Sequence, residues 1–276
     1  MSEHYFTLAR LYSLSRQFHA RSWVWFLDID GTLLDIAPSP LAVTVPDDLI
    51  VSLNRLAESP RHRIALISGR SLADIDQFFP NPLFSKSGNH GAEYYCNNKT
   101  WLHYSSRRFL AVRPRVLDTL ASLPEQFPGL FIEDKQYSLS VHYRHVNSSQ
   151  HALLSTILRT RLSSVESITI HPAKLCWEIR PDPGPTKADA VQRLYNQISP
   201  QLPKPTLPVI MGDDRTDEDA FGAVNPAVTI HVGNHNRPTQ ALYRINSPQQ
   251  VRDLITDVSR AACFFAEASL SPEDNG

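Results

Sequence analysis

Two aspartates lie two residues apart, directly after an apolar stretch of the chain. Residues 23–27 read Trp-Val-Trp-Phe-Leu, and Asp28-Ile-Asp30-Gly-Thr32 follows them. Two close carboxylates repel each other, and a divalent cation relieves that repulsion. Ligand sets made only of oxygen favour magnesium. Because an Asp-x-Asp pair is also common in surface turns, its meaning depends on Gly31, Thr32 and the polar residues of other segments.

Ser68 and Lys187 are the next residues whose position indicates chemistry. Ser68 follows the apolar residues 63–67, where a hydroxyl and backbone N–H groups at a helix start can hold an anion. The alternative is that Ser68 only caps a helix. Lys187 comes at the start of a predicted helix, where the helix dipole disfavours a cation. A lysine suits that place better if it faces a bound anion.

Five acidic residues crowd into seven positions after the apolar residues 207–211: Asp213, Asp214, Asp217, Glu218 and Asp219. Acidic residues are favoured in the first turn of a helix, which explains the last three. It explains the adjacent pair Asp213 and Asp214 at a strand end poorly. This pair therefore predicts further metal or phosphate chemistry.

The segments that must position these residues alternate between strands and helices. Apolar runs at 23–27, 63–67 and 207–211 predict strands, and residues 47–58, 72–79 and 187–198 predict helices. Alternation of this kind indicates a parallel α/β sheet. Ligands bind such sheets at the carboxyl ends of the strands, where all three runs deliver polar residues.

The middle of the chain predicts a second, α+β domain, which we call the cap. Helices are expected at 113–127 and 149–162, and strands at 130–133, 137–144, 168–171 and 174–180. In two strands the residue types alternate. Tyr137, Leu139, Val141 and Tyr143 lie opposite Ser138, Ser140, His142 and Arg144, and Leu175, Trp177 and Ile179 lie opposite Lys174, Cys176, Glu178 and Arg180. We expect the cap at 111–180, the core at 21–110 and 181–266, an N-terminal extension at 1–20 and a tail at 267–276.

Composition excludes several classes of protein. The 27 basic and 28 acidic residues leave a net charge of −1, which is unsuited to nucleic-acid binding. The 3 cysteines are far apart and include no Cys-x-x-Cys, which favours a reducing, cytoplasmic compartment without a disulfide framework or zinc site. No apolar run approaches the roughly 20 residues of a membrane span. Residues 5–18 predict a short amphipathic helix or an ordered tail.

Taken in order, the Asp28–Thr32 motif, Ser68, Lys187 and the Asp213–Asp214 pair resemble the haloacid dehalogenase superfamily of phosphotransferases. Longer motifs are similar to the trehalose-6-phosphate phosphatase family, namely those at 87–93, 132–144, 174–181 and 212–221. The resemblance covers nearly the whole chain after Arg21 and implies a Rossmann-like core with an inserted α+β cap. One departure is Ala188, because the family usually has glycine after the motif lysine.

In the core, the resemblance implies Asp28 as nucleophile and Asp30 as general acid and base, with Ser68 and Lys187 holding the phosphoryl group. It further implies Mg²⁺ bound by Asp28, Asp213 and the backbone carbonyl of Asp30, with Asp214 and Asp217 just outside these ligands. The resemblance implies substrate-binding roles for residues of the second and third core motifs and of the cap: Gly69, Arg70, His90, Glu133, Lys135, Arg144, Lys174 and Glu178. Salt bridges on a solvated sheet face are the alternative for the cap residues.

The expected function is hydrolysis of trehalose 6-phosphate to trehalose and phosphate through an aspartyl-phosphate, in trehalose biosynthesis. The expected partner is this sugar phosphate, with possible functional pairing with a trehalose-phosphate synthase. One alternative is another sugar phosphatase of the superfamily, acting on sucrose or mannosylglycerate phosphates. The other is a non-catalytic subunit that binds a sugar phosphate.

Overall fold

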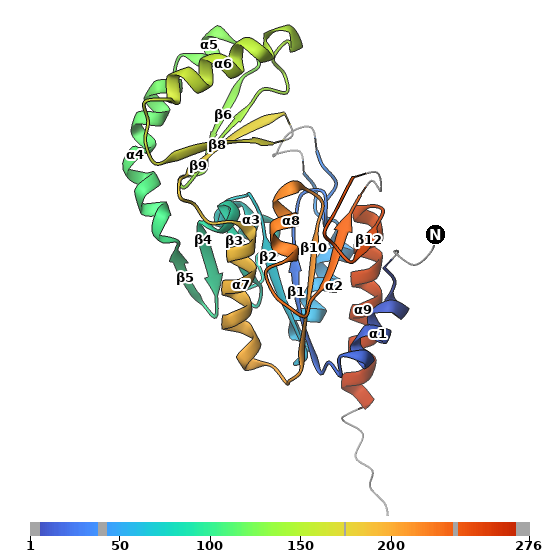
Figure 1. Cartoon of the computed structure of the whole chain (residues 1–276). Helices are drawn as coiled ribbons and strands as arrows, with labels where there is room; N and C mark the ends of the chain where they lie inside the picture. The colour runs from blue at the N-terminus through green and yellow to red at the C-terminus, as the bar shows by residue number, and fades with distance from the viewer. Residues whose placement is uncertain (1–5, 38–42, 174, 234–236, 269–276) are drawn as a thin grey trace, which may run out of the picture. The chain divides into compact units, whose positions relative to one another are not determined.

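The computed structural model describes residues 6–37, 43–173, 175–233 and 237–268 (Figure 1). The chain forms two compact units. The core unit contains Met1–Gly91, Tyr95–Thr100 and Thr186–Gly276, and the cap unit contains Ala92–Tyr94 and Trp101–Pro185. Each unit is described by itself below.

Parallel strands dominate the 8-stranded sheet that organises the core unit, in the order β12-β11-β10-β1-β2-β3-β4-β5. Neighbouring strands from β12 to β3 pair in parallel. The strands are β1 Ser22–Leu27, β2 His62–Ile67, β3 Ser85–Gly88, β4 Glu93–Cys96, β5 Lys99–Leu102, β10 Thr206–Gly212, β11 Val228–Val232 and β12 Tyr243–Ile245. The predicted parallel α/β sheet is confirmed, and the three predicted strands lie within β1, β2 and β10.

Capping side chains fix where several core helices begin. Ser71 caps α3 together with Asp74, and Thr186 caps α7 together with Asp189, each pair bonding reciprocally to backbone N–H groups. The core helices are α1 Leu8–Gln17, α2 Asp47–Glu58, α3 Leu72–Phe78, α7 Lys187–Ile198, α8 Arg215–Phe221 and α9 Pro248–Ala268. The helices predicted at 47–58 and 187–198 are therefore confirmed, as is a helix within residues 5–18.

Both faces of the core sheet are covered by helices. Trp25 and Leu27 of β1 belong to a buried cluster shared with α1, α2, α3 and α9. On the same strand, Phe26 packs instead on Tyr195 of α7, with ring centroids 6.4 Å apart. Alternate residues of the buried strand thus serve opposite faces, as the two-residue period requires. None of the helices described has the length and apolar character needed to cross a bilayer.

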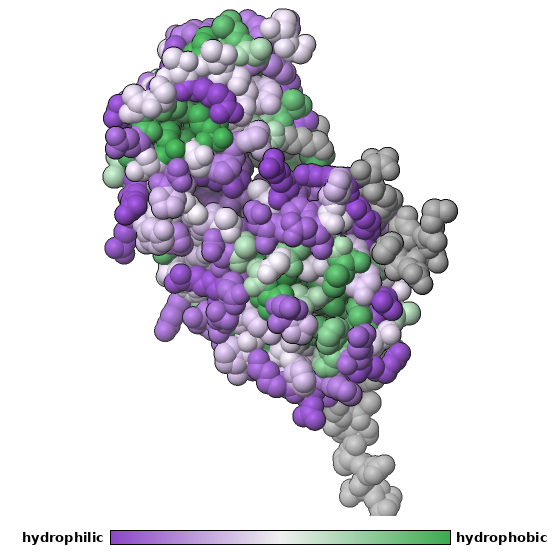
Figure 2. Space-filling view, in the orientation of Figure 1, coloured by the Kyte–Doolittle hydropathy of each residue, from purple (hydrophilic) through white to green (hydrophobic). Residues whose placement is uncertain are grey.

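The cap unit has its own antiparallel sheet, in the order β6-β7-β9-β8. Its elements are α4 Tyr104–Leu120, α5 Leu123–Gln126, β6 Phe131–Asp134, β7 Leu139–His142, α6 His151–Leu162, β8 Ile168–Ala173 and β9 Cys176–Pro181. A separate hydrophobic core, including Phe109, Leu158 and Ile179, holds the helices to one face of this sheet. Figure 2 shows apolar patches on the surface of this unit, so its core does not enclose every apolar side chain.

Three expectations for the cap were wrong in detail. The helix predicted at 113–127 begins earlier, as α4, and a break separates it from the short α5. The strand predicted at 137–144 is shorter, since β7 covers Leu139–His142. Leu175 has a φ of 57° and is exposed, so it lies outside β9 and does not share the buried face of Trp177 and Ile179.

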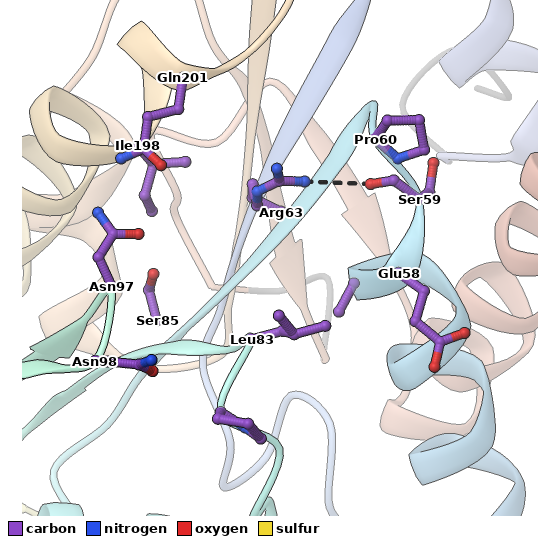
Figure 3. A pocket seen from close by; sticks show the side chains of 12 residues that line it. Glu58, Ser59, Pro60, Arg63, Leu83, Ser85, Asn97, Asn98, Ile198 and Gln201 are labelled. Atoms are coloured by element: carbon purple, nitrogen blue, oxygen red, sulfur yellow. Dashed lines mark hydrogen bonds between the residues drawn. The ribbon is translucent and has the colours of Figure 1, made fainter.

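A cavity of about 560 Å³ lies in the core unit, beside the residues that open β2 and β3 (Figure 3). Arg63 enters it from β2, and its guanidinium donates to the Ser59 carbonyl at 3.2 Å. Leu83, Asn97 and Gln201 also line it. None of the predicted site residues lines it, and Asp28, Ser68 and Asp213 follow the opposite, carboxyl ends of their strands.

The imidazole of His62 lies in the core, where its Nδ1 accepts a hydrogen bond from Trp25 Nε1 at 3.0 Å and its ring stacks on Trp23. Burial, aided by the charges of Arg61 and Arg63, lowers the pKa of His62 from 6.5 to about 3. As pH falls, the His62 ring is therefore protonated near pH 6.5 in the unfolded chain but only near pH 3 in the folded chain. The free energy of unfolding that depends on a neutral His62 is fully present above pH 6.5, and it is lost as pH falls from 6.5 toward about 3.

We predict that the titration of His62 lowers the free energy of unfolding of the wild-type protein by about 2 kcal/mol when pH falls from 7 to 5. The measurement is urea unfolding at both pH values for wild type, His62→Gln and, as a control, His145→Gln at an exposed position. His62→Gln should lose less stability over this interval than wild type, whereas His145→Gln should match wild type. Equal pH dependence in all three proteins would contradict the prediction.

Candidate active site

Three parallel strands of the core deliver polar residues to one edge of the sheet. Asp28 directly follows β1, Ser68 follows β2 and Asp213 follows β10. The register pairs Leu27 with both Met211 and Leu66, so these strand ends are level with one another. The carboxyl edge predicted from the sequence is therefore assembled as expected.

Lys187 joins two carboxylates at this edge. Its Nζ donates to Asp28 Oδ1 at 2.7 Å and to Asp217 Oδ1 at 2.8 Å, and all three side chains are buried. The lysine occupies the first residue of α7, after the cap residue Thr186. The helix dipole opposes a cation there, and the two buried carboxylates outweigh it.

Asp214 and Asp217 also build the helix that follows β10. Asp214 is the N-cap of α8: its Oδ1 accepts from Thr216 N at 2.6 Å, while its own N–H donates to Asp217 Oδ2 at 3.2 Å. The Asp217 carboxylate thus accepts from Lys187 through Oδ1 and from the N-terminus of α8 through Oδ2. The acidic residues that crowd together in the sequence thus have two roles: Asp214 and Asp217 form the capping box of α8, and Asp217 also belongs to the site.

Burial and charge shift the titration of these groups in opposite directions. Burial raises the pKa of Asp28 and of Asp217, and the nearby Lys187 only partly offsets this. For Lys187, burial would lower the pKa, but Asp217 and Asp28 raise it well above its ordinary value. Burial acts against ionisation of Asp214 as well, yet Lys187 and the bonds from Thr216 lower its pKa to about 2. The lysine therefore stays protonated among acids that need its charge.

The acidic cluster fits a divalent cation. Asp28, Asp213 and Asp217 each offer an oxygen, and these atoms lie within 4.8 Å of one another. Asp28 Oδ2 is buried and receives no hydrogen bond from any residue the structure describes. Carboxylate oxygens are the ligands magnesium prefers. The backbone makes room for them, since a Cβ on Gly31, which has a φ of 89°, would lie 2.2 Å from Asp213 Oδ2.

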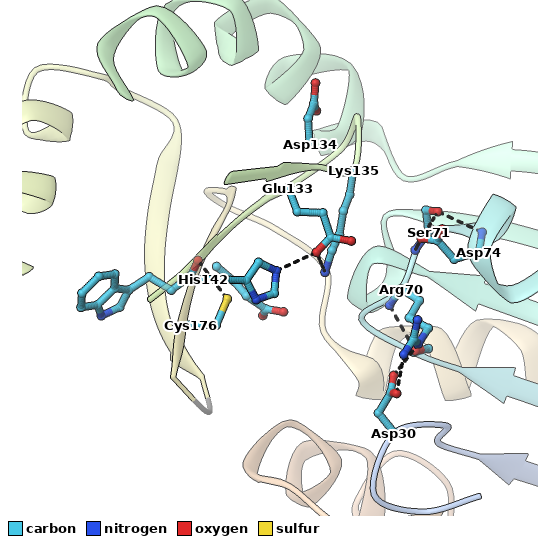
Figure 4. A network of polar contacts seen from close by, with 12 residues as sticks. Asp30, Arg70, Ser71, Asp74, Glu133, Asp134, Lys135, His142 and Cys176 are labelled. Atoms are coloured by element: carbon cyan, nitrogen blue, oxygen red, sulfur yellow. Dashed lines mark hydrogen bonds and ion pairs between the residues drawn. The ribbon is translucent and has the colours of Figure 1, made fainter. Parts of the chain in front are cut away.

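Arg70 contacts Asp30, an interaction that the sequence did not indicate. Its Nε and Nη2 each donate to an Asp30 carboxylate oxygen at 2.7 Å, a two-point pair (Figure 4). Ser68 Oγ, itself buried, accepts from Arg70 N at 3.1 Å. His90 packs against the backbone of Gly69, where a Cβ would lie 2.4 Å from its Nε2. The predicted residues Ser68, Gly69, Arg70 and His90 are thus brought together with Asp30.

The cap residues form their own polar network. Glu133 and Glu178 share one row of the sheet, because both pair in register with Ser140. Glu133 Oε2 lies 2.9 Å from His142 Nε2 and 3.6 Å from Lys135 Nζ (Figure 4). Glu178 pairs with Arg180. Two predicted residues are not in this network: Arg144 follows β7 and contacts none of the network's described side chains, and Lys174 lies outside the described residues.

His142 and Arg180 were not predicted as site residues. The strand alternation already placed both on the polar face, so a signal for them existed. Their contacts to Glu133 and Glu178 mean that the two predicted acids are engaged within the cap. The salt-bridge alternative for this face therefore accounts for part of what is observed.

The fold and the site together define a class: the chain has the Rossmann-like core and inserted α+β cap of the haloacid dehalogenase superfamily. The family model described as Trehalose-phosphatase matches residues 26–249. The chain belongs to the trehalose-phosphatase family.

Named relatives and a solved structure agree with this membership. The chain is 32% identical over 225 residues to trehalose-6-phosphate phosphatase of Escherichia coli, covering 81% of each chain. It is 31% identical over 248 residues to trehalose-phosphate phosphatase of Mycobacterium tuberculosis, covering 87% of this chain and 62% of that protein. A crystal structure titled trehalose-6-phosphate phosphatase related protein superposes with a TM-score of 0.77 at 26% identity, covering 88% of this chain and 99% of that one. The chain thus spans less than two thirds of the length of the mycobacterial relatives.

We predict that Asp213→Asn weakens binding of Mg²⁺ by about 10- to 100-fold or more, because even residues behind direct metal ligands contribute that much affinity. Isothermal calorimetry with Mg²⁺ and no substrate measures this directly. Asp219→Asn, an exposed neighbour on α8, is the matched control and should keep wild-type affinity. Unchanged binding in Asp213→Asn would move the metal to other oxygens of the cluster.

Proposed function

We propose that this protein is a magnesium-dependent phosphatase that hydrolyses trehalose 6-phosphate to trehalose and inorganic phosphate. The observation that carries the proposal is the buried Asp28: one carboxylate oxygen is held by Lys187, and the other receives no hydrogen bond from the described residues. A carboxylate in that state has an oxygen available for a metal or for phosphorus. Family membership supports the same chemistry.

In the proposed first step, an Asp28 oxygen attacks phosphorus, and the bond from phosphorus to the sugar oxygen breaks. An aspartyl-phosphate forms, and the sugar oxygen takes a proton from Asp30. In the second step water attacks phosphorus, its proton passes to Asp30, and Asp28 is released with inorganic phosphate. Because burial raises the pKa of Asp28, the charge of Lys187 is needed to keep the nucleophile ionised.

Mg²⁺ held by Asp28, Asp213 and the Asp30 carbonyl would neutralise charge on the phosphoryl oxygens. Asp217 is a further oxygen of the same cluster, while Asp214 orders the start of α8. Ser68 and Lys187 would hold the remaining phosphoryl oxygens. These donors address the equatorial oxygens, where charge is concentrated in phosphoryl transfer.

Asp30 must release one bond from Arg70 before it can carry a proton, because both its oxygens accept from the guanidinium. We propose that Arg70 turns to the substrate when Asp30 works as the acid. Gly69 and His90 would complete the binding surface for the ester, since they adjoin Ser68 and Arg70. This exchange of partners links substrate binding to readiness of the acid.

For the sugar, we propose that the polar face of the cap sheet binds the hydroxyl groups through Glu133, Lys135, Arg144, Lys174 and Glu178. We keep the division into a core at 21–110 and 181–266 and a cap at 111–180 as part of this proposal. A sugar phosphatase with a different disaccharide specificity would differ at these residues. A non-catalytic binding subunit is disfavoured, because Asp28, Asp30, Lys187 and Asp213 are all retained.

A cytoplasmic location belongs to the same proposal. Cys96 and Cys176 carry free thiols, which suits a reducing compartment. The phosphate ester must be supplied by a glycosyl transfer that joins two sugars, one of them phosphorylated. We therefore propose functional pairing with a trehalose-phosphate synthase, which would catalyse that transfer.

The proposed function predicts that wild-type protein releases phosphate from trehalose 6-phosphate only when Mg²⁺ is present, and that Asp28→Asn lowers kcat at least about 1,000-fold. An amide cannot attack phosphorus as a carboxylate does. Phosphate release is measured across a panel of sugar phosphates, with and without chelator, using Asp47→Asn at an exposed position as control. Substantial turnover by folded Asp28→Asn would exclude Asp28 as nucleophile.

Glu178→Ala and Glu133→Ala should each lower kcat/KM for trehalose 6-phosphate by about 5- to 150-fold, since a buried hydrogen-bond acceptor contributes about 1–3 kcal/mol. Hydrolysis of p-nitrophenyl phosphate, which has no sugar hydroxyls, should change little. Glu125→Ala, exposed in α5, serves as the control. Equal losses on both substrates would mean that Glu133 and Glu178 only support the cap through their pairs with His142 and Arg180.

A further inference from the structure

A buried arginine of the C-terminal helix reaches the turn that carries the catalytic aspartates. Arg252, on α9, is 8% exposed. Its Nη1 donates to the backbone carbonyl of Leu33 at 2.9 Å. Its Nη2 donates to Asp35 Oδ2 at 3.1 Å and to Gln249 Oε1 at 2.7 Å. The guanidinium therefore spans the end of this turn and its own helix.

The bond to Leu33 is the important one of these contacts. The Asp35 side chain is 74% exposed, so water screens its charge and the pair with Arg252 contributes little. The Leu33 carbonyl is instead buried, where a hydrogen bond from a cation is strong and its loss is costly. Arg252 thus holds the backbone of the turn more firmly than it holds the acid.

The turn is a closed unit that transmits the position of Leu33 to the site. Gly31 N donates to Leu34 O at 2.7 Å, and Leu34 N donates back to Ile29 O at 2.9 Å. Asp28 and Asp30 flank Ile29, and Gly31 is in contact with Asp213. A displacement of Leu33 would therefore also displace the Asp30 carbonyl and the Gly31 backbone that packs against the Asp213 carboxylate.

We propose that Arg252 is a positioning residue, which fixes the Ile29–Leu34 turn so that the Asp28, Asp30 and Asp213 oxygens keep the spacing a divalent cation requires. It touches neither metal nor substrate. Helix α9 would hold its place without the arginine, because Val251 and Ile255 on either side are 0% exposed in the core. The role of Arg252 is thus separable from the packing of its helix.

The test compares Arg252→Met, Arg252→Lys and Arg260→Met by Mg²⁺ calorimetry, by kcat and KM for p-nitrophenyl phosphate, and by thermal unfolding. Arg260, which is 67% exposed on the same helix, is the matched control. Because small displacements of reacting groups cost up to about 100-fold in rate, we expect Arg252→Met to lose about 10-fold or more in kcat and in Mg²⁺ affinity. KM should change less. Lysine can still donate to Leu33 and should restore part of both losses, whereas Arg260→Met should equal wild type.

The proposal is overturned if folded Arg252→Met matches Arg260→Met in Mg²⁺ affinity and kcat. If Arg252→Met does not fold, Arg252→Gln, which loses the charge but keeps a polar end, is measured in its place: weakened Mg²⁺ binding with intact folding supports the proposal, and wild-type binding overturns it. The proposal builds on the proposed function, but the calorimetry needs no turnover. Wild-type protein that binds Mg²⁺ yet hydrolyses no ester would refute the phosphatase and leave this comparison valid.

Discussion

The interaction on which the rest of the site depends is the burial of one lysine among several carboxylates. Lys187 lies between Asp28 and Asp217, and its side chain is only 3% exposed. Removing these charges from water costs several kcal/mol per ion, and close pairing is what offsets that cost. The lysine alone leaves the cluster with excess negative charge, because Asp213 and Asp214 lie close by. Charge balance at this sheet edge therefore favours a cation in addition to Lys187.

The fold supplies this arrangement through ordinary devices. Parallel strands bring Asp28 and Asp213 to the same edge, and a capping box places Lys187 at the first residue of α7. Glycine at position 31 lets the turn approach Asp213 more closely than any side chain would allow. The same features that terminate strands and begin helices thus determine the distances on which the chemistry depends.

The apolar strands and their polar ends could be predicted because local pattern and tertiary position coincide there. The run from Trp23 to Leu27 is apolar throughout, since both faces of β1 are covered by helices. The short strands β4 and β5, by contrast, have weak patterns, and the hairpin turn between them contains Asn97 and Asn98 at positive φ. Leu175 misled the cap assignment for a similar reason: its residue type fits the alternation, but its backbone does not. Local residue types do not reveal where a strand begins when a turn residue happens to be apolar.

The contacts that sequence could not supply are those between distant segments that share no periodic pattern. Arg70 and Asp30 are 40 residues apart, and Arg252 and Leu33 are 219 apart. Each pair forms because the sheet brings separate βα units together. The residue spacing around these side chains does not indicate that they are partners. Both pairs act on the same short turn, one at the Asp30 carboxylate and the other at the Leu33 carbonyl. Two guanidinium groups, one from the loop after β2 and one from α9, thus restrict the backbone motion of this turn. A site whose oxygens must surround a small cation requires such rigidity.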